Sequence, residues 1–158
     1  MQENNKIGAG FGVMLLRGNK ILLGLRHTDP NKADSELHGE GTWTMPGGKL
    51  HFGESFEVGA QREMLEETGI HIETKDLEVI SLSNDMVPDA HFVTVGMLCK
   101  KFQGEAKVIE PDEITEWQWF NLDALPENIF FPSARVLKNY SNKRFYTPEY
   151  EKFLVHSS

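Results

Sequence analysis

Five glutamates fall within fourteen residues in the middle of the chain, at Glu54, Glu57, Glu63, Glu66 and Glu67. On an α-helix, side chains three and four residues apart lie close together, so Glu63, Glu66 and Glu67 would crowd one face. Like charges at this spacing destabilise a helix unless a cation neutralises them, and oxygen ligands favour Mg²⁺, Mn²⁺ or Ca²⁺. A solvated acidic face is the ordinary explanation of such a run, but this spacing predicts a divalent-metal site.

The helix that carries these acids is predicted over Ser55 to Thr68, with Ser55 as the N-cap and Gly69 as the C-terminal stop. Val58 and Leu65 are seven residues apart and lie on the side opposite the acidic face. We therefore expect these two residues to make the helix's contact with the core.

A turn at Pro46-Gly47-Gly48 precedes this helix. Glycine carries no side chain, so the backbone at this turn can approach a ligand or a metal closely. Alone, the sequence indicates an ordinary tight turn. Beside an acidic helix it indicates part of a ligand site.

The elements that must position these groups follow from hydrophobic patterning. Phe11 to Leu16 and Ile21 to Leu25 are predicted strands of a hairpin, closed by a tight turn over Arg17 to Lys20. Thr28 to Thr42 is polar and is predicted to be a long surface loop. Further strands are expected at Leu77 to Leu82, Phe92 to Cys99 and Trp117 to Phe120, and a second helix at Ser133 to Tyr140. The hairpin favours a mixed sheet, so the fold class is α/β or α+β.

The stretch from Gly48 to Ile70 resembles a complete Nudix box. It contains Gly48, five residues, Glu54, seven residues, and then the sequence REMLEETGI from Arg62 to Ile70. Because every defined position matches, a chance match is negligible. The hairpin, the lead-in before Gly48 and the later strands are similar to the rest of this MutT-like family. The resemblance implies an α/β/α sandwich with a mixed sheet, and a single Nudix domain over residues 1–158.

The resemblance implies a set of metal ligands. In this family the glutamates that match Glu63, Glu66 and Glu67 hold divalent metals, and the backbone carbonyl that matches Gly47 adds a ligand. The implied cofactor is Mg²⁺, with Mn²⁺ as a substitute.

Catalytic roles are implied for four residues of the box. Arg62 is expected to orient the glutamates and to pair with Glu54. Glu63 and Glu67 are candidates for the general base, which must lie within hydrogen-bond reach of the attacking water. Glu113 lies in a region from which some members supply an extra acid, although a solvated loop acid is an equally good explanation.

Substrate contacts are expected around the same cleft. Arg26 and Lys49 are candidates for phosphate contacts, and Gly48 for a close backbone approach. Four residues could line a base pocket or simply belong to the core: His91, Phe92, Phe130 and Phe131.

The implied reaction is hydrolysis of a phosphoanhydride bond in a nucleoside diphosphate-linked substrate. The resemblance to the small members of the family, carried by Glu110 to Glu113 and Glu116 to Trp119, favours a nucleoside triphosphate that yields the monophosphate and pyrophosphate. The alternatives are a nucleotide sugar, ADP-ribose, NADH, dihydroneopterin triphosphate or a capped RNA. A non-catalytic ligand sensor is a further alternative, which the intact box and the short chain disfavour.

Composition narrows the partners and the compartment. The 158 residues are 39% hydrophobic, as expected of one domain, and the formal net charge is -8. That charge works against binding to a nucleic-acid duplex or to an anionic membrane. Cys99 is the single cysteine, and the polar segment Met1 to Lys6 is not a targeting signal, so we expect a cytoplasmic protein. A homodimer is common among proteins that this chain resembles.

Overall fold

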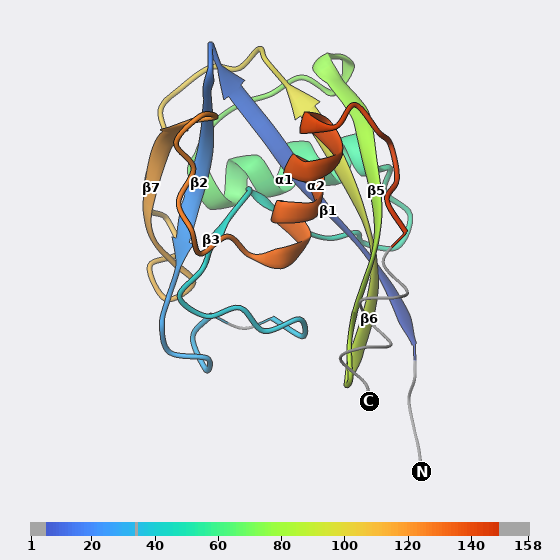
Figure 1. The fold of residues 1–158 in the computed structure, drawn as a ribbon. Coiled ribbons are helices and arrows are strands. Elements are labelled where there is room, and N and C mark those ends of the chain that lie inside the picture. Colours follow the sequence, from blue (N-terminus) through green and yellow to red (C-terminus); the bar gives the residue numbers. More distant parts are fainter. Residues whose placement is uncertain (1–5, 34, 149–158) are drawn as a thin grey trace.

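The computed structural model describes residues 6–33 and 35–148 (Figure 1). The elements in chain order are β1 Ile7–Arg17, β2 Lys20–Arg26, β3 Trp43–Thr44, β4 Gly47–Lys49, α1 Phe56–Thr68, a 3₁₀ helix Thr74–Asp76, β5 Leu77–Val87, β6 Ala90–Cys99, β7 Ile114–Asn121 and α2 Phe131–Ser141. Within these described residues, neither helix has the length and apolar character needed to cross a membrane.

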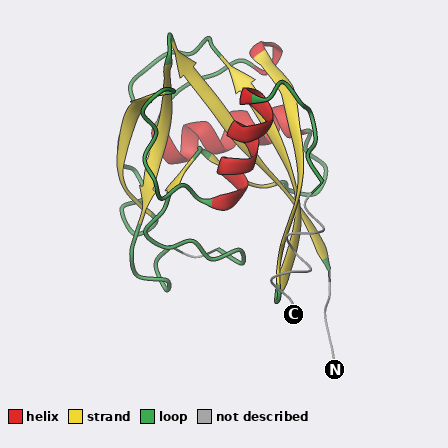
Figure 2. Ribbon diagram, viewed as in Figure 1, coloured by secondary structure: helices red, strands yellow, loops and turns green. Residues whose placement is uncertain are grey.

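The sheet is mixed, as the sequence predicts, and strand β1 lies at its centre (Figure 2). It pairs in parallel with β6, and antiparallel with β4 and with the start of β2. Strand β5 extends the sheet beyond β6, while β3 and β7 pair antiparallel with β2. The strand order is β3-β2-β1-β6-β5, with β4 attached to β1 and β7 to β2.

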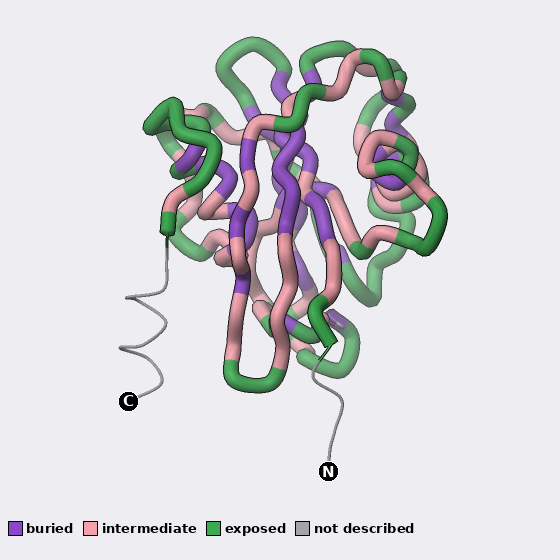
Figure 3. Tube along the Cα trace, turned by 90° about the vertical axis from the view of Figure 1, so that its right-hand side faces the viewer, coloured by how far each residue is buried: buried purple, intermediate pink, exposed green. Residues whose placement is uncertain are grey.

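The two faces of β1 belong to two separate cores, because successive side chains of a strand point to opposite faces. Phe11, Val13 and Leu15 pack with Ala60 and Met64 of α1. On the other face, Met14 and Leu16 pack with Val136 and Leu137 of α2. In Figure 1, α2 lies in front of β1 and α1 behind it, and burial is concentrated in the middle of the central strands in Figure 3. The predicted α/β/α sandwich is confirmed.

Most of the predicted elements are present with somewhat longer bounds. The hairpin turn closes with Arg17 opposite Lys20, and Gly18 has a left-handed φ of 62°. The described residues of the predicted loop from Thr28 to Thr42 contain neither helix nor strand. Strand β3 was not predicted, because two residues give no periodic signal. The turn predicted at Pro46 to Gly48 is wrong, because Gly47 and Gly48 belong to strand β4, where their missing side chains let it pair with β1. Helix α2 starts two residues before the predicted Ser133.

The orientation predicted for α1 is wrong. The caps are as expected, because the Ser55 hydroxyl accepts a hydrogen bond from Val58 N at 3.1 Å and Gly69 has a φ of 79°. Val58 and Leu65, however, are 46% and 44% exposed. The helix is turned so that its acidic side faces β4, and the side opposite it faces solvent. The residues that it buries are Gly59, Ala60, Met64 and Thr68.

Two neighbouring residues of α1 test this orientation. Met64 is fully buried, so Met64→Ala should lower the free energy of unfolding by about 2–5 kcal/mol, the usual range for such a cavity. Leu65→Ala removes a side chain that is largely in solvent and should change it by no more than about 0.5 kcal/mol. Denaturant unfolding of both variants measures the difference. Equal losses would contradict the observed orientation.

Candidate metal and substrate site

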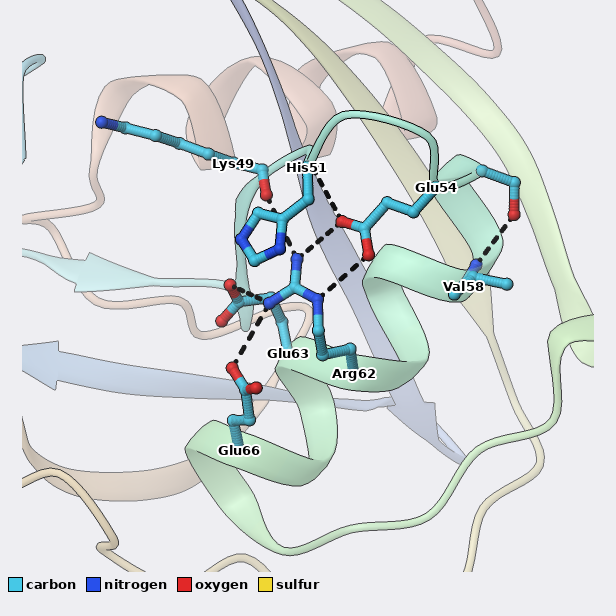
Figure 4. A network of polar contacts seen from close by, with 8 residues as sticks. Lys49, His51, Glu54, Val58, Arg62, Glu63 and Glu66 are labelled. Atoms are coloured by element: carbon cyan, nitrogen blue, oxygen red, sulfur yellow. Dashed lines mark hydrogen bonds and ion pairs between the residues drawn. The ribbon is translucent and has the colours of Figure 1, made fainter.

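Arg62 is the centre of an ion-pair network on α1 (Figure 4). Its guanidinium donates to both carboxylate oxygens of Glu54, with Nε–Oε2 at 3.1 Å and Nη2–Oε1 at 2.7 Å. Its Nη1 donates to Glu63 at 2.9 Å and to Glu66 at 3.3 Å, and its Nη2 to the Lys49 carbonyl at 3.3 Å. The predicted pairing of Arg62 with Glu54 is therefore confirmed, and the same arginine also contacts two of the predicted metal ligands.

The network stabilises the charged forms of Arg62 and Glu54. Hydrogen bonds from Arg62 and from the backbone N–H of His51 lower the pKa of the Glu54 carboxyl to about 2. The contact with Glu54 in turn raises the pKa of Arg62 above its already high value. The bidentate geometry holds the guanidinium plane in one orientation. Arg62 is thus a fixed positive charge beside the acidic face.

Glu63 and Glu67 are in the opposite electrostatic situation. Burial raises the pKa of the Glu67 carboxyl well above its usual value, and the negative charge of Glu63 adds to the rise. The backbone N–H of Gly47, which donates to Glu67 Oε1 at 3.0 Å, opposes it. Burial also raises the pKa of Glu63, against the effect of Arg62. Both carboxylates would be stabilised by an added cation.

Two glycines of β4 allow the strand to approach its neighbours. A Cβ on Gly48 would lie 2.7 Å from Glu63 Oε2, and a Cβ on Gly47 would lie 2.1 Å from the Phe11 carbonyl oxygen. The space occupied by the Glu63 carboxylate therefore exists only because residue 48 has no side chain.

The backbone of Gly47 faces α1. Gly47 lies opposite Gly12, between hydrogen bonds that join β1 to residues 46 and 50. In an antiparallel ladder, such a pair directs its N–H and C=O groups away from the partner strand. The N–H reaches Glu67, and the carbonyl that was predicted to bind metal lies on the same side as the N–H.

The donor set has the chemistry of a hard-cation site. Carboxylates and a carbonyl are the ligands that Mg²⁺ and Mn²⁺ prefer. Among the described residues, no three acidic, histidine or cysteine side chains already converge as a ligand group. Glu63 and Glu66 point to Arg62, while Glu67 points to Gly47. Ion binding would therefore require some of these carboxylates to turn.

A cavity of about 200 Å³ adjoins the acidic face. It lies between β1, β4, the start of α2 and the loop after β2. The lining includes six residues expected at the site from the sequence, namely Arg26, Gly47, Gly48, Lys49, Glu67 and Glu113. The other four, Glu54, Arg62, Glu63 and Glu66, are not among the lining residues. The structure thus brings the candidate phosphate contacts close to Glu67, near the C-terminal end of α1.

The two candidate phosphate-binding cations also contact groups of the protein. Arg26 is 8% exposed, donates from Nη2 to the Ala33 carbonyl at 2.8 Å, and lies over the Phe130 ring at 4.7 Å. The Lys49 ammonium forms an ion pair with Glu36. A substrate phosphate would therefore compete with these contacts.

The aromatic candidates divide into two groups. Phe92 and Phe130 line the cavity. His91 instead forms a hydrogen bond with Asn84, and Phe131 packs beneath Arg135 at 5.0 Å. Only the first pair is positioned to contact a ligand in the cavity.

Sequence reasoning missed two groups near the site. The charge of Glu110 contributes to the raised pKa values of both Glu63 and Glu67. Glu110 belongs to the acidic segment Glu110 to Glu113 just before β7, and this position could have indicated that it lies near the site. Ser133, at the start of α2, lines the cavity and its hydroxyl accepts from Met45 N at 3.0 Å. Nothing in the local sequence indicates that role.

Fold and site together define a class of protein, and comparison with known proteins agrees. The model of the NUDIX domain matches residues 6–140. The chain belongs to the Nudix family of hydrolases.

Relatives within the family differ in their named substrates. The chain is 32% identical over 124 residues to an ADP-ribose pyrophosphatase of Methanocaldococcus jannaschii, covering 78% of this chain and 67% of that protein. It is 32% identical over 116 residues to the oxidized purine nucleoside triphosphate hydrolase of Mus musculus, covering 72% and 66%. The chain thus spans about two thirds of the length of these relatives.

The fold is shared with solved structures. A MutT NUDIX hydrolase from Burkholderia pseudomallei superposes with a TM-score of 0.74 at 29% identity, covering 85% of this chain and 98% of that one. A MutT protein from Methanosarcina mazei superposes with a TM-score of 0.71 at 19% identity, covering 90% and 98%.

The contact between Gly48 and Glu63 gives a test of the metal site. Gly48→Ala should displace the flexible Glu63 carboxylate and weaken Mn²⁺ binding by about 10-fold or more, the scale for loss of support to a metal ligand. The matched control is Gly12→Ala on the facing strand, whose Cβ would meet Met45 Cβ at 3.6 Å and Sδ at 3.7 Å, both ordinary contacts. Titration of Mn²⁺ by electron paramagnetic resonance compares the two. Unchanged affinity in Gly48→Ala would remove Glu63 from the ligand set.

Proposed function

We propose that this chain is a Mg²⁺-dependent hydrolase that cleaves a nucleoside triphosphate into the monophosphate and pyrophosphate. One observation carries the proposal: Glu67 on the acidic face of α1 also lines the cavity, together with Gly47 and Gly48. A nucleotide whose base enters the cavity would present its phosphates to that face.

The chain's own residues would divide the work. Glu63, Glu66, Glu67 and the Gly47 carbonyl would hold Mg²⁺, which neutralises substrate phosphates and the charge that develops in the transition state. Arg62, fixed by Glu54, would keep the glutamates oriented. Glu63 or Glu67 would accept a proton from the attacking water, a role that suits a carboxylate whose pKa is raised.

The substrate would lie along the cavity with its base enclosed. Phe92 and Phe130 offer aromatic faces for stacking, while Arg26, Lys49 and the backbone of Gly48 would contact phosphates. The volume of about 200 Å³ is below the usual ~300–1,000 Å³ of pockets that enclose a whole drug-sized ligand. We therefore expect only the base to be enclosed. The mouse relative named as a nucleoside triphosphate hydrolase supports this substrate class.

ADP-ribose is the second candidate, and the similarity to the archaeal ADP-ribose pyrophosphatase favours it. Its hydrolysis would use the same glutamates of α1 and would cleave the same kind of phosphoanhydride bond. A screen of nucleoside triphosphates and ADP-ribose at equal concentration, ranked by kcat/KM, separates the two candidates.

The position of attack gives a direct test. With a nucleoside triphosphate and Mg²⁺ in ¹⁸O-labelled water, the expected products are the monophosphate and pyrophosphate, with one labelled oxygen in one of them. Mass analysis of both products identifies the phosphorus that is attacked. Inorganic phosphate as the first product, or full turnover in excess chelator, would overturn the proposal.

Charge-removing substitutions on α1 test the metal helix. A glutamine is a poor ligand for a hard cation and does not accept the proton from water, so Glu63→Gln and Glu67→Gln should each lower kcat/KM by at least ~10²-fold. The control is Glu57→Gln in the same helix, which should stay within a few-fold of wild type. Thermal unfolding of the metal-free variants should show no loss of stability, because burial raises the pKa of both carboxyls and their negative charge therefore costs folding free energy, even with Arg62 beside Glu63. If the control loses as much activity, or the two variants fail only by unfolding, the assignment is wrong.

A further inference from the structure

An ion pair lies at the solvent-exposed edge of the cavity, which we call its mouth. The Lys49 ammonium on β4 contacts the carboxylate of Glu36, which belongs to the loop of residues 27–42 between β2 and β3. Both residues line the cavity, as does Glu67 of the acidic face. The pair is therefore part of the wall that a phosphate chain bound at the edge of the cavity would contact.

Lys49 is held in this place by its backbone. It pairs with Gly10 of β1, and its carbonyl accepts from Arg62 at 3.3 Å. The side chain extends away from Arg62 and its network of acids (Figure 4). Lys49 and Arg26 are the only cationic residues among those described as lining the cavity. The backbone thus keeps the Lys49 ammonium near the mouth, where it can attract an anion.

Glu36 lies near the middle of this loop, where the backbone on either side of it is anchored. Arg26 holds the Ala33 carbonyl, and Ala33 and Leu37 are buried on either side of Glu36. The contacts farther out are exposed ion pairs, Lys32 with Asp112 at 4.0 Å and His38 with Asp89 at 3.2 Å. In Figure 1 the loop extends below the sheet toward the start of β6. Exposed pairs of this kind hold a loop only weakly.

We propose that Glu36 is an autoinhibitory group that occupies, on Lys49, the place of a substrate phosphate. The inference rests on the proposed function, because it requires a substrate with a phosphate chain. A phosphate that binds Lys49 must first displace the Glu36 carboxylate, and the negative charge of Glu36 repels the incoming chain. Substrate binding is thereby coupled to rotation of the exposed Glu36 side chain away from the mouth.

The exposure of the pair fits a displaceable contact. The side chains of Lys49 and Glu36 are 62% and 56% exposed, so solvent screens their attraction. A polyphosphate carries several charges and competes effectively with one carboxylate for an ammonium group. The inhibition should weaken as salt rises, because both the attraction and the repulsion are screened.

The test uses the full chain and a charge-matched control. Glu36→Gln should lower KM about two- to five-fold at low ionic strength, the upper value corresponding to the ~1 kcal/mol of a strong exposed ion pair, with kcat little changed. Glu40→Gln removes a charge from the same loop, and Glu40 is neither a lining residue nor in an ion pair among the described contacts. It should leave KM nearly unchanged, because screening weakens distant charges.

Lys49→Gln completes a double-mutant cycle. It should raise KM, and in its background Glu36→Gln should have a clearly smaller effect, because only the repulsion by Glu36 then remains. If Glu36→Gln leaves KM unchanged or raises it, or if its effect is as large without Lys49 as with it, the inference is overturned.

A binding measurement separates this inference from the proposed function. Isothermal titration with Mg²⁺-tripolyphosphate can follow the same four proteins without turnover. If no nucleotide is hydrolysed but Glu36→Gln raises the affinity more when Lys49 is present than when it is replaced, the proposed function fails and the inference stands. If hydrolysis occurs but the effect of Glu36→Gln on tripolyphosphate affinity is the same with and without Lys49, the inference alone fails. It also fails alone if hydrolysis occurs but none of the four proteins binds tripolyphosphate.

Discussion

The bidentate ion pair between Arg62 and Glu54 is the interaction on which the site depends. It joins α1 to the segment between β4 and the helix, and the same guanidinium reaches Glu63, Glu66 and the carbonyl of Lys49. The carboxylates on one side of this helix would otherwise repel one another. One half-buried cation thus offsets this repulsion and, through the Lys49 carbonyl, holds β4 beside the acidic face.

The sheet explains why that face lies at a cavity. Strand β1 gives alternate side chains to α1 and α2, so the two helices cover opposite sides of one strand. The glycines of β4 then let α1 approach closely, with Glu63 against Gly48 and Glu67 bonded to Gly47. The start of α2 forms part of the opposite wall through Phe130 and Ser133. A functional site formed by both helices therefore follows from the alternation of a single central strand.

Sequence reasoning was most successful where the signal is local. The caps of α1, the hairpin turn and the pairing of Arg62 with Glu54 depend on neighbouring residues, and all three are present. The rotation of α1 was predicted wrongly because apolar residues occur on two of its sides, and only the glycine-rich strand decides that Ala60 and Met64 face inward. The contact of Lys49 with Glu36 joins a strand to an irregular loop, for which no spacing rule exists.

An acidic protein that binds a polyanion must control where its positive charge is accessible. The net charge is -8, and the two cationic residues that line the cavity already contact a carbonyl, an aromatic ring or a carboxylate of the protein. The carboxylates that would hold a metal are likewise held by Arg62 or by Gly47. Arg26, Lys49 and the three glutamates of α1 that are expected to meet the substrate therefore each have a partner within the protein. A ligand that binds these groups must replace their contacts within the protein. Its affinity therefore depends on the difference in free energy between the contacts it makes and the contacts it replaces, and the replaced contacts contribute to selectivity.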